Sequence, residues 1–438
     1  MVSNNHTMAR TISILLMICI LILSCGKQEV SEKEVISETP PPNILFVIAD
    51  DMGKDATPNY SEGSKKPQMP TLEMLASSGI TFDNMWAYPV CSPTRASIIT
   101  GKLGYHNGVL EVEQDISLSE ETLHDFIKTQ SNGTYDTALI GKWHLSNNIT
   151  DPNTMGIDHF SGVLGGGVSS YTNWKEVING IRVDNTTYTT TAFSNRAIEW
   201  IGSREKPWFL WLAYNAPHTP FHLAPTNLHQ QGSLPSDDVS IETNPLPYYF
   251  SAIEALDKEL GRVIAAIPNG LENTIVIFLG DNGTPSQVIQ TPYRPRRAKG
   301  SIYQGGINVP MVIAGAGVSR KGVREAALIQ STDLFTTIAQ MAGGEITAKH
   351  NSRSFYSLIG NANTTIRTHA YAEKSLNGVV SYAVRDNQYK LIVKADGTEL
   401  LYDLNSDAYE QNNLLNNPTQ EIEIIKSNLS EEAQRIRN

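Results

Sequence analysis

A single cysteine, Cys91, stands in the part of the sequence that can fold, and its surroundings suit chemistry. The other two cysteines belong to an apolar N-terminal run, so Cys91 has no partner for a structural disulfide. In the segment CSPTRASIITGK, Ser92 suits the N-cap of a helix, Pro93 its first position and Gly101 its end. We therefore expect Cys91 at a helix N-terminus, where negative charge is stabilised. The alternative is a buried, inert small side chain.

Polar residues also follow three apolar runs that are far apart in the sequence. Asp50 and Asp51 follow NILFVIA, His218 comes soon after WFLWLAY, and Asp281 and Asn282 follow TIVIFLG. Such runs predict strands buried on both faces of a mostly parallel sheet. Because ligands of open α/β sheets bind beyond the carboxyl ends of the strands, we expect these residues to meet at one site.

Two more candidates, Lys142 and His144, lie two residues apart in a segment that leaves another predicted strand. In an extended segment their side chains face the same way, while Trp143 turns toward the core. They can therefore enter one site together, although each could also be an ordinary surface or packed polar residue.

The elements that position these residues predict an α/β fold. Helical patterns at 121–130 and 249–267 alternate with the strands, which indicates a large, mostly parallel mixed sheet flanked by helices. Segments 381–393 and 398–404 alternate like antiparallel strands, with turns at 386–387 and 396–397. We therefore expect a main domain over 43–364 and a small C-terminal α+β subdomain over 365–438, closed by a helix after Thr419.

The N-terminus predicts export. Arg10 precedes an apolar run that is too short to span a bilayer comfortably and that has the layout of a secretory signal. The run ends like a bacterial lipobox, which would make Cys25 the lipidated first residue after a signal peptide of residues 1–25. Gly26 then favours the outer membrane, on its periplasmic or cell-surface face, and the acidic, Pro-rich stretch 26–42 would be a disordered tether. An ordinary cleaved signal or an uncleaved anchor helix is the alternative.

Composition limits the partners. The 438 residues include 34 Lys and Arg against 45 Asp and Glu, a formal net charge of -11. Such a chain has no general attraction for nucleic acid or anionic lipid. We therefore expect no nucleic-acid partner, contact with a membrane only through the lipid anchor, and a local basic cluster for any anionic substrate.

Cys91, Pro93 and Arg95 fit the signature C-x-P-x-R, so the sequence resembles the formylglycine-dependent type I sulfatases of the alkaline phosphatase superfamily. A second motif of that family matches YDTALIGKWH, and the resemblance extends from residue 43 to about residue 407. It implies an alkaline-phosphatase-like fold, hydrolysis of sulfate esters, and a maturation enzyme that oxidises the cysteine to formylglycine. The hydrated aldehyde carries two hydroxyls, one to attack sulfur and one to expel sulfate afterwards.

The resemblance also implies a metal site. Its ligands would be an oxygen of modified Cys91 and the side chains of Asp50, Asp51, Asp281 and Asn282. Ligands that are all oxygen suit a hard cation, Ca²⁺ before Mg²⁺. Because neighbouring residues on an ideal strand point in opposite directions, Asp50 and Asp51 can share a metal only where the strand breaks, as Gly53 suggests. A solvated acidic turn is the alternative.

By the same resemblance, Lys142 and Lys299 would bind sulfate oxygens and Arg95 would hold the two hydroxyls of formylglycine. His144 would take a proton from one hydroxyl, and His218 would protonate the leaving alcohol. The chain departs from the family at Gln304 and Asn308, where Glu and Arg are frequent, and at Lys102, where Arg is frequent. These departures concern local hydrogen bonds rather than the reaction.

An exported enzyme of this kind suggests a sulfated oligo- or polysaccharide as substrate. Arg294, Arg296 and Arg297 could hold a polyanionic glycan, or could form a solvated basic loop. The Gly-rich stretch 162–174 could add a wall with Trp174 as a stacking surface. The rival functions are a phosphodiester or phosphonate monoester hydrolase of the same superfamily, and a glycan-binding lipoprotein without turnover.

Overall fold

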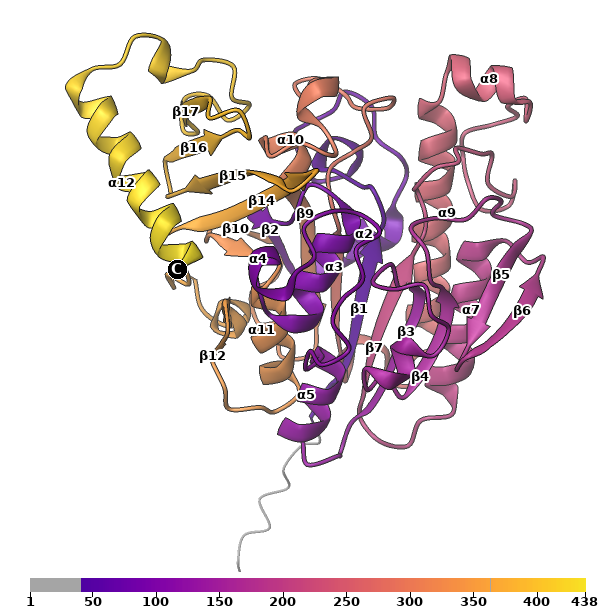
Figure 1. Ribbon diagram of the computed structural model, residues 1–438. Coiled ribbons are helices and arrows are strands. Elements are labelled where there is room, and N and C mark those ends of the chain that lie inside the picture. The colour runs from indigo at the N-terminus through magenta and orange to yellow at the C-terminus, as the bar shows by residue number, and fades with distance from the viewer. Residues whose placement is uncertain (1–40, 363) are drawn as a thin grey trace, which may run out of the picture. The chain divides into compact units, whose positions relative to one another are not determined.

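A mixed sheet of eleven strands runs through the structure, a computed structural model that describes residues 41–362 and 364–438 (Figure 1). The predicted signal peptide with Cys25, and the tether up to residue 40, lie outside the described residues. None of the helices within the described ranges is both long and apolar enough to cross a membrane.

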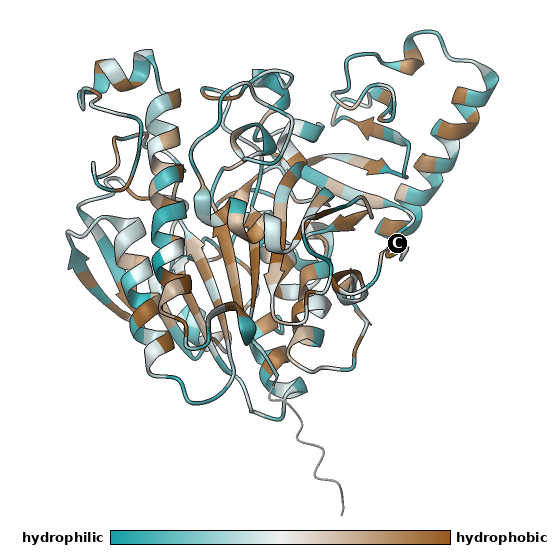
Figure 2. Ribbon diagram, turned by 180° about the vertical axis from the view of Figure 1, so that it is seen from behind, coloured by the Kyte–Doolittle hydropathy of each residue, from teal (hydrophilic) through white to brown (hydrophobic). Residues whose placement is uncertain are grey.

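The centre of the sheet is parallel. β1 (Asn43–Ala49) lies between β7 (Trp208–Tyr214) and β8 (Thr274–Gly280), and β3 (Asp136–Lys142) joins β7 to β4 (His159–Val163). β1, β7 and β8 are buried runs of mostly apolar residues, and Figure 2 shows the centre of the sheet as strongly hydrophobic. The sheet is therefore mostly parallel at its centre, as the sequence predicts.

Strands in mixed orientations complete both edges. On one side β9 (Asn308–Gly315) pairs antiparallel with β8 and with β2 (Ile80–Trp86). The short strands β10 (Val323–Glu325) and β11 (Ile329–Gln330) pair in parallel with the other edge of β2. On the other side β4 is followed by β5 (Trp174–Ile178) and β6 (Ile181–Asn185). A separate two-stranded sheet pairs β12 (Ala348–Lys349) with β13 (Ser352–Arg353).

Helices cover both faces, because side chains of β1 alternate between two hydrophobic clusters. Ile44, Phe46 and Ile48 pack with α3 (Cys91–Thr100), α5 (Leu123–Gln130) and α11 (Asp333–Met341). Leu45, Val47 and Ala49 pack with α2 (Pro70–Ser78), α7 (Thr189–Gly202) and α9 (Leu246–Ala265). The smaller helices are α4 (Gly104–Asn107), α6 (Asp151–Thr154), α8 (Asp238–Thr243), α10 (Gln304–Ile307), η1 (Lys54–Ala56), η2 (Gly270–Glu272), η3 (Pro295–Arg297), η4 (Tyr356–Ile359) and η5 (Leu414–Asn416).

The C-terminal part forms the predicted antiparallel sheet. Its four strands, in order, are β14 (Ala370–Leu376), β15 (Val379–Arg385), β16 (Tyr389–Val393) and β17 (Glu399–Asp403). The final helix α12 (Gln420–Arg437) packs on one face, and Thr419 caps it by accepting a hydrogen bond from the Ile422 N–H. The other face packs on residues around Ile302 and Ile307. The predicted fold class is confirmed.

Candidate active site

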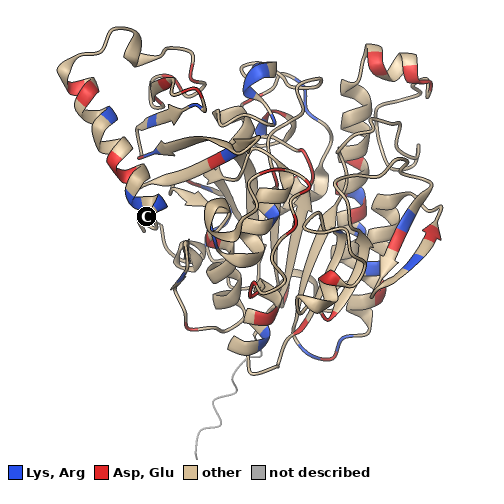
Figure 3. Ribbon diagram, in the orientation of Figure 1, with Lys and Arg blue, Asp and Glu red and all other residues tan. Residues whose placement is uncertain are grey.

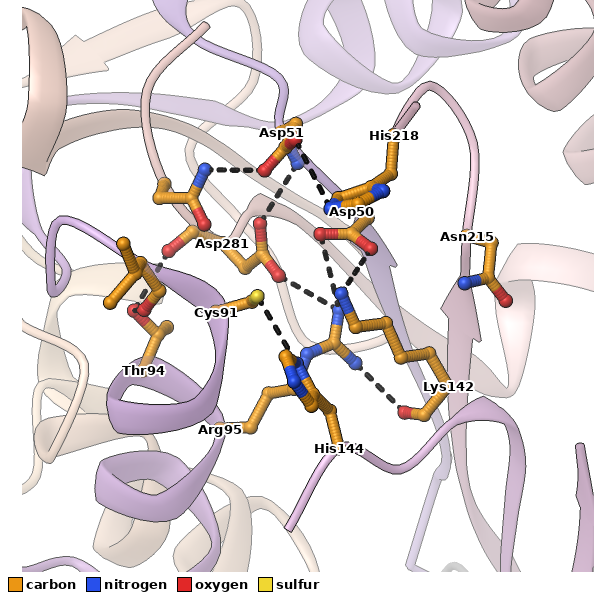
Figure 4. Close-up of polar contacts among 12 residues, drawn as sticks. Asp50, Asp51, Cys91, Thr94, Arg95, Lys142, His144, Asn215, His218 and Asp281 are labelled. Atoms are coloured by element: carbon orange, nitrogen blue, oxygen red, sulfur yellow. Dashed lines mark hydrogen bonds and ion pairs between the residues drawn. The ribbon is translucent and has the colours of Figure 1, made fainter. Parts of the chain in front are cut away.

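The carboxyl ends of the three central strands carry the candidate site (Figure 4). β1, β7 and β8 are parallel and in register, so that Ala49 lies opposite both Tyr214 and Gly280. The residues that follow each strand therefore emerge at the same edge of the sheet. Asp51 and Asp281 come from segments 230 residues apart, yet the Asp51 N–H donates to Asp281 Oδ1 at 3.0 Å.

The strand breaks at Asp51, and this break allows the neighbouring carboxylates of Asp50 and Asp51 to face one site. Its φ of 69° lies in the left-handed region, and the Tyr249 hydroxyl donates to its carbonyl at 2.8 Å. Oxygens of Asp50 and Asp51 and a ring nitrogen of His218 lie within 4.8 Å of one another. The break expected near Gly53 therefore occurs at Asp51 itself.

Two buried oxygens of this cluster lack hydrogen-bond partners within the described residues. They are Asp50 Oδ1 and Asn282 Oδ1. The Asn282 amide nitrogen donates to Asp51 Oδ1 at 2.8 Å, which fixes the carbonyl end of that side chain in the cluster. Unpaired buried oxygens are costly. The donor set therefore fits a hard cation bound by oxygen ligands.

The charges of the cluster support the same conclusion. Burial and the neighbouring charge of Asp50 together raise the pKa of Asp281 to about 6, against the attraction of Arg95 and Lys142. Burial also acts to raise the pKa of Asp50, but the attraction of Lys142, His218 and Arg95 outweighs it and lowers that pKa. Two carboxylates this close hold their charge only with positive partners, which Lys142 and Arg95 supply in part, and a bound cation would add another.

Three basic side chains already touch the carboxylates. Lys142 Nζ lies 2.6 Å from Asp50 Oδ2 and Arg95 Nη2 lies 2.8 Å from Asp281 Oδ2. Both pairs are fully buried, and Arg95 also donates to the Lys142 carbonyl at 2.8 Å. Lys299 Nζ lies 2.6 Å from Asp51 Oδ2 at the more open side. The site thus holds positive charge for an anionic substrate.

Cys91 lies at the first residue of α3, beside these groups. The helix begins directly after Val90, so the predicted N-cap at Ser92 and first position at Pro93 are wrong by two residues. Tertiary contacts hold this end instead, since the Thr94 hydroxyl donates to the Asp281 carbonyl at 2.8 Å and the whole helix is buried. The predicted end at Gly101 is confirmed by its left-handed φ of 66°.

Burial decides the chemistry of the unmodified thiol. It raises the pKa of Cys91 to about 11, although Lys142 acts in the opposite direction. The expected stabilisation of negative charge at this helix end is therefore outweighed. A thiol with this pKa is protonated at neutral pH and is a poor nucleophile.

His144 contacts the Cys91 side chain. Its Nδ1 lies 3.2 Å from Cys91 Sγ, and its Nε2 lies 2.8 Å from Glu113 Oε1. β3 ends at Lys142, and His144 has a left-handed φ of 56°, so a turn rather than an extended segment brings both side chains into the site. Trp143 packs in the core, as expected.

The protonation of His144 follows from these neighbours. Burial, together with the positive charges of Lys142 and Arg95, lowers its pKa to about 2. The ring is therefore neutral at physiological pH. Its Nε2–H donates to Glu113, which leaves Nδ1 as an acceptor that faces residue 91.

His218 lies on the open side of the cluster. Its Nδ1 lies 2.8 Å from the Thr219 carbonyl, and its Nε2 lies 3.6 Å from Asp51 Oδ2. Its side chain is 18% exposed, compared with 4% for His144. The two histidines thus face different parts of the site, one toward residue 91 and one toward the opening.

Sequence reasoning missed several residues of the site. Glu113 belongs to no motif, and Asn215, which follows β7, has a buried side chain without hydrogen bonds in the described part of the chain. A Cβ on Gly166 would lie 2.7 Å from the His144 ring, and one on Gly167 would lie 3.2 Å from the His218 ring. The Gly-rich stretch could have been recognised as a close approach of backbone to side chain.

The expected substrate-binding residues divide into three groups. Trp174 is buried in the core, where its Nε1–H donates to the Thr187 carbonyl at 2.8 Å, so the prediction of a stacking surface is wrong. Arg294 is exposed and contacts Gln411. Arg296 and Arg297 line a groove together with residues of the C-terminal sheet.

Comparisons with known proteins agree with this site. The sulfatase family profile matches residues 42–344, and the profile of the N-sulphoglucosamine sulphohydrolase C-terminal region matches residues 298–438. Mouse arylsulfatase J is 28% identical over 334 residues, which are 70% of this chain and 54% of that protein. This chain thus spans about half of that relative's length.

Longer alignments exist with bacterial proteins. The ulvan-active sulfatase of Formosa agariphila is 25% identical over 449 residues, 95% of this chain and 84% of that protein. The crystal structure of Ps i-CgsB, 25% identical, superposes with a TM-score of 0.77 over 90% of this chain and 92% of that one. The sulfatase profile alone covers more than half of the sequence. The chain therefore belongs to the sulfatase family.

Proposed function

We propose that this protein removes sulfate from a sulfated oligo- or polysaccharide, using formylglycine formed from Cys91 and a divalent cation, Ca²⁺ before Mg²⁺. The observation that carries the proposal is the position of residue 91. Its side chain lies 3.2 Å from a neutral histidine, at the edge of the sheet where a carboxylate cluster with unpaired oxygens meets buried basic groups. A maturation enzyme must form the formylglycine.

Two groups would complete the site. The hydrate of formylglycine would supply one hydroxyl as a nucleophile for sulfur and a second for release of sulfate, and the cation would supply positive charge for the sulfate oxygens. The residues that would hold the cation, through oxygen atoms, are Asp50, Asp51, Asp281 and Asn282. The unpaired oxygens and the absence of His or Cys among these four support Ca²⁺ as the preferred ion.

Basic side chains bind and orient the sulfate. Without these basic groups, three carboxylates would repel an anionic substrate. Lys142 places its ammonium group 2.6 Å from Asp50, and Lys299 places its own 2.6 Å from Asp51. Arg95 is fixed by hydrogen bonds to Asp281 and to the Lys142 carbonyl, so its position does not depend on the substrate. Positive charge arranged before the substrate arrives stabilises the charge that develops in the transition state.

The two histidines move different protons. His144 accepts a proton at Nδ1 from the group at position 91, and Glu113 holds the opposite side of the ring in the required tautomer. His218 holds a proton at Nε2 for the leaving alcohol, on the side of the site that is open to a sugar. A sugar alcohol has a high pKa and requires this proton as the ester bond breaks.

Several observations support a carbohydrate substrate outside the cell. One relative is named an ulvan-active sulfatase and another, from human, N-acetylgalactosamine-6-sulfatase. The apolar run that ends at Cys25 supports export and lipid anchoring, with outer-membrane sorting suggested by Gly26. The lipid would then be the contact with the membrane, and the substrate a glycan of the surroundings.

The test compares hydrolysis of nitrophenyl sulfate with that of a nitrophenyl phosphodiester, for protein with formylglycine at position 91. The expected result is a kcat/KM that is higher for the sulfate, with no turnover of either by Cys91→Ala. A higher value for the phosphodiester would instead indicate a phosphodiesterase. Glycan binding without any turnover of the modified protein would indicate a binding protein.

A further inference from the structure

A basic groove opens beside the active site, between the η3 segment and the C-terminal sheet. Its volume is about 580 Å³, and its walls carry four cationic side chains and one carboxylate. The cations are Arg296, Arg297, Lys374 and Lys394, and the carboxylate is Asp396. This local excess of positive charge contrasts with the formal charge of -11 of the whole chain.

The groove begins at the residue that follows Lys299. Lys374 Nζ donates to the Gly300 carbonyl at 2.7 Å, and the Gly300 N–H donates to the Pro89 carbonyl at 2.8 Å, two residues before Cys91. Lys299 itself reaches Asp51 in the active site. One short segment, 299–303, therefore contributes a lysine to the site and part of a wall to the groove.

The cations of the groove are available to a ligand. Among the described residues, the side chains of Arg296 and Lys394 form no hydrogen bond or ion pair, and Arg296 is exposed. Arg297 is held in place, since its guanidinium lies 4.5 Å from the centre of the Tyr303 ring and donates to the Glu410 carbonyl. Lys374 is held by the Gly300 carbonyl, so two fixed and two free cations face the groove and suit the binding of an anionic group.

The opposite flank of the active site has the opposite charge. A hollow next to His218 is lined by Phe221 and by Asp238 and Glu242 of α8, and both carboxylates are exposed. In Figure 3, red residues mark α8 at the upper right, whereas η3 carries Arg296 and Arg297. An anionic ligand would be attracted to one flank and repelled by the other.

We infer that the groove binds a second anionic group, a sulfate or a carboxylate, of the glycan whose target sulfate ester lies at the active site. This inference rests on the proposed function and narrows it to glycans with at least two anionic groups. Ile302, Leu376 and Ile392 also line the groove and offer apolar surface for a sugar ring.

The test uses a double variant, Arg296→Gln with Lys394→Gln, which removes the two cations without partners. The matched control is Arg182→Gln with Lys321→Gln, which removes two exposed cations outside both hollows and outside the active site. Each protein, with formylglycine at position 91, is assayed on nitrophenyl sulfate, on a polysulfated oligosaccharide, and on a monosulfated oligosaccharide with or without a uronate.

The groove variant should lose roughly tenfold in kcat/KM on the polysulfated oligosaccharide, mainly through KM, as expected for two charge-assisted contacts. The loss of kcat/KM on the polysulfated oligosaccharide should be at least fivefold larger than the loss of the same variant on nitrophenyl sulfate. The control variant should have the kcat/KM of the wild type on every substrate. Equal losses on nitrophenyl sulfate and on every oligosaccharide, or equal losses in the groove variant and the control, would overturn the inference. An effect restricted to the uronate substrate would identify a carboxylate as the bound group.

A direct binding measurement separates failure of the groove from failure of the proposed function. Calorimetry with Cys91→Ala and the polysulfated oligosaccharide should show weaker binding when Arg296 and Lys394 are replaced, whether or not the wild type hydrolyses sulfate esters. Unchanged affinity, together with normal turnover of nitrophenyl sulfate, would reject the groove and leave the proposed reaction intact.

Discussion

The two histidines of the site differ in what surrounds them, and this difference predicts their separate effects. His144 is almost fully buried between residue 91 and Glu113, whereas His218 lies at the opening, beside Asp51. In the proposed reaction, His144 would therefore serve the group at position 91 for every substrate. His218 would serve the leaving alcohol, so its contribution to the rate would depend on how readily that alcohol leaves.

We expect His218→Ala to reduce kcat/KM on a sugar sulfate by roughly a hundredfold, within the range of general acid catalysis, and far less on nitrophenyl sulfate. The reason is that nitrophenolate leaves without a proton and a sugar alcohol does not. His144→Ala should slow both substrates and produce a burst of the first product, because it acts after the alcohol has left.

Steady-state rates on the two substrates, with a stopped-flow measurement of the burst, test this assignment. Equal losses on both substrates for His218→Ala, together with a burst in that variant, would mean that the roles are exchanged.

At the scale of single residues, the sequence predicted the groups with obvious chemistry but not those that hold them. Asp50, Asp51 and Asp281 follow buried strands, and parallel pairing brings such positions together. Glu113 lies in a turn, with a left-handed φ of 59°, and only the three-dimensional structure places it beside His144. Positioning residues of this kind carry no motif, because many backbone paths can deliver a carboxylate.

Among the elements, the Gly-rich segment is closest to the catalytic groups. A Cβ on Gly166 would lie 2.7 Å from the His144 ring and 2.9 Å from Glu113 Oε1. A Cβ on Gly165, the preceding residue, would have its nearest neighbour at 3.9 Å. Two adjacent glycines therefore differ in whether a methyl group would displace a catalytic side chain.

Gly166→Ala should lower kcat on nitrophenyl sulfate by roughly 10- to 100-fold, because a small displacement of a reacting group is costly. Gly165→Ala should retain wild-type activity and is the control. Thermal unfolding of both variants should resemble that of the wild type. A wild-type rate for Gly166→Ala would contradict the close contact.

The packing of α5 on the sheet predicts a pH dependence of stability. His124 is buried between α5 and β7, with ring centres 5.0 Å from Phe209 and 6.1 Å from Trp211. Burial lowers its pKa from 6.5 to about 3, although the hydrogen bond to the Ala138 carbonyl opposes this. Below pH 6.5 the unfolded chain binds a proton that the folded protein does not, so stability falls as the pH falls.

The contribution of His124 to the free energy of unfolding should therefore decrease by about 1.4 kcal/mol per pH unit, or about 2 kcal/mol between pH 6.5 and pH 5. Denaturant unfolding at several pH values should show a shallower pH dependence for His124→Gln than for the wild type. His106→Gln, at an exposed position, is the control. Parallel pH profiles for His124→Gln and the wild type would contradict the prediction.

The sequence predicted which segments form helices and strands better than it predicted the residues at which those elements begin and end. The buried strands β1, β7 and β8 were predicted because a short, continuous apolar run between polar residues is typical of a strand buried on both faces. The start of α3 was wrong because contacts from Asp281 and the surrounding core replace a capping side chain. Such tertiary contacts override local preferences.

The whole molecule concentrates buried charge at one edge of its sheet. Three carboxylates lie there with two lysines and an arginine, and two oxygens of the cluster have no hydrogen bond among the described residues. A cation that binds the folded protein and not the unfolded chain stabilises the fold through mass action. Metal binding should therefore be visible without any assay of activity.

Adding Ca²⁺ to chelator-treated protein should raise the free energy of unfolding by about 2.7 kcal/mol when the free ion is at a hundred times its Kd. The same concentration of Mg²⁺ should stabilise less. Thermal unfolding measures this, and Asp281→Ala should abolish both the stabilisation and the activity. Asp184→Ala, at an exposed position outside the site and the groove, should retain both. Full activity in excess chelator, with no metal in the protein, would contradict the cation site.

At this scale the sequence predicted the two sheets but not how the η3 segment and the C-terminal sheet jointly form the basic groove. The groove combines residues 296–303 with strands β14 to β16, and the pairing of such distant segments cannot be read from a single sequence. Arg296 and Arg297 were expected to hold an anionic glycan, whereas the contribution of Lys374 and Lys394 emerges only from the structure.

The most direct test of the proposed reaction relates activity to the chemical state of residue 91. Preparations with different extents of maturation are analysed by peptide mass spectrometry, and sulfate release per mole of total protein is measured for each. We predict a rate that is proportional to the fraction of formylglycine and that extrapolates to zero when only the thiol is present. A rate that does not depend on this fraction would contradict the account.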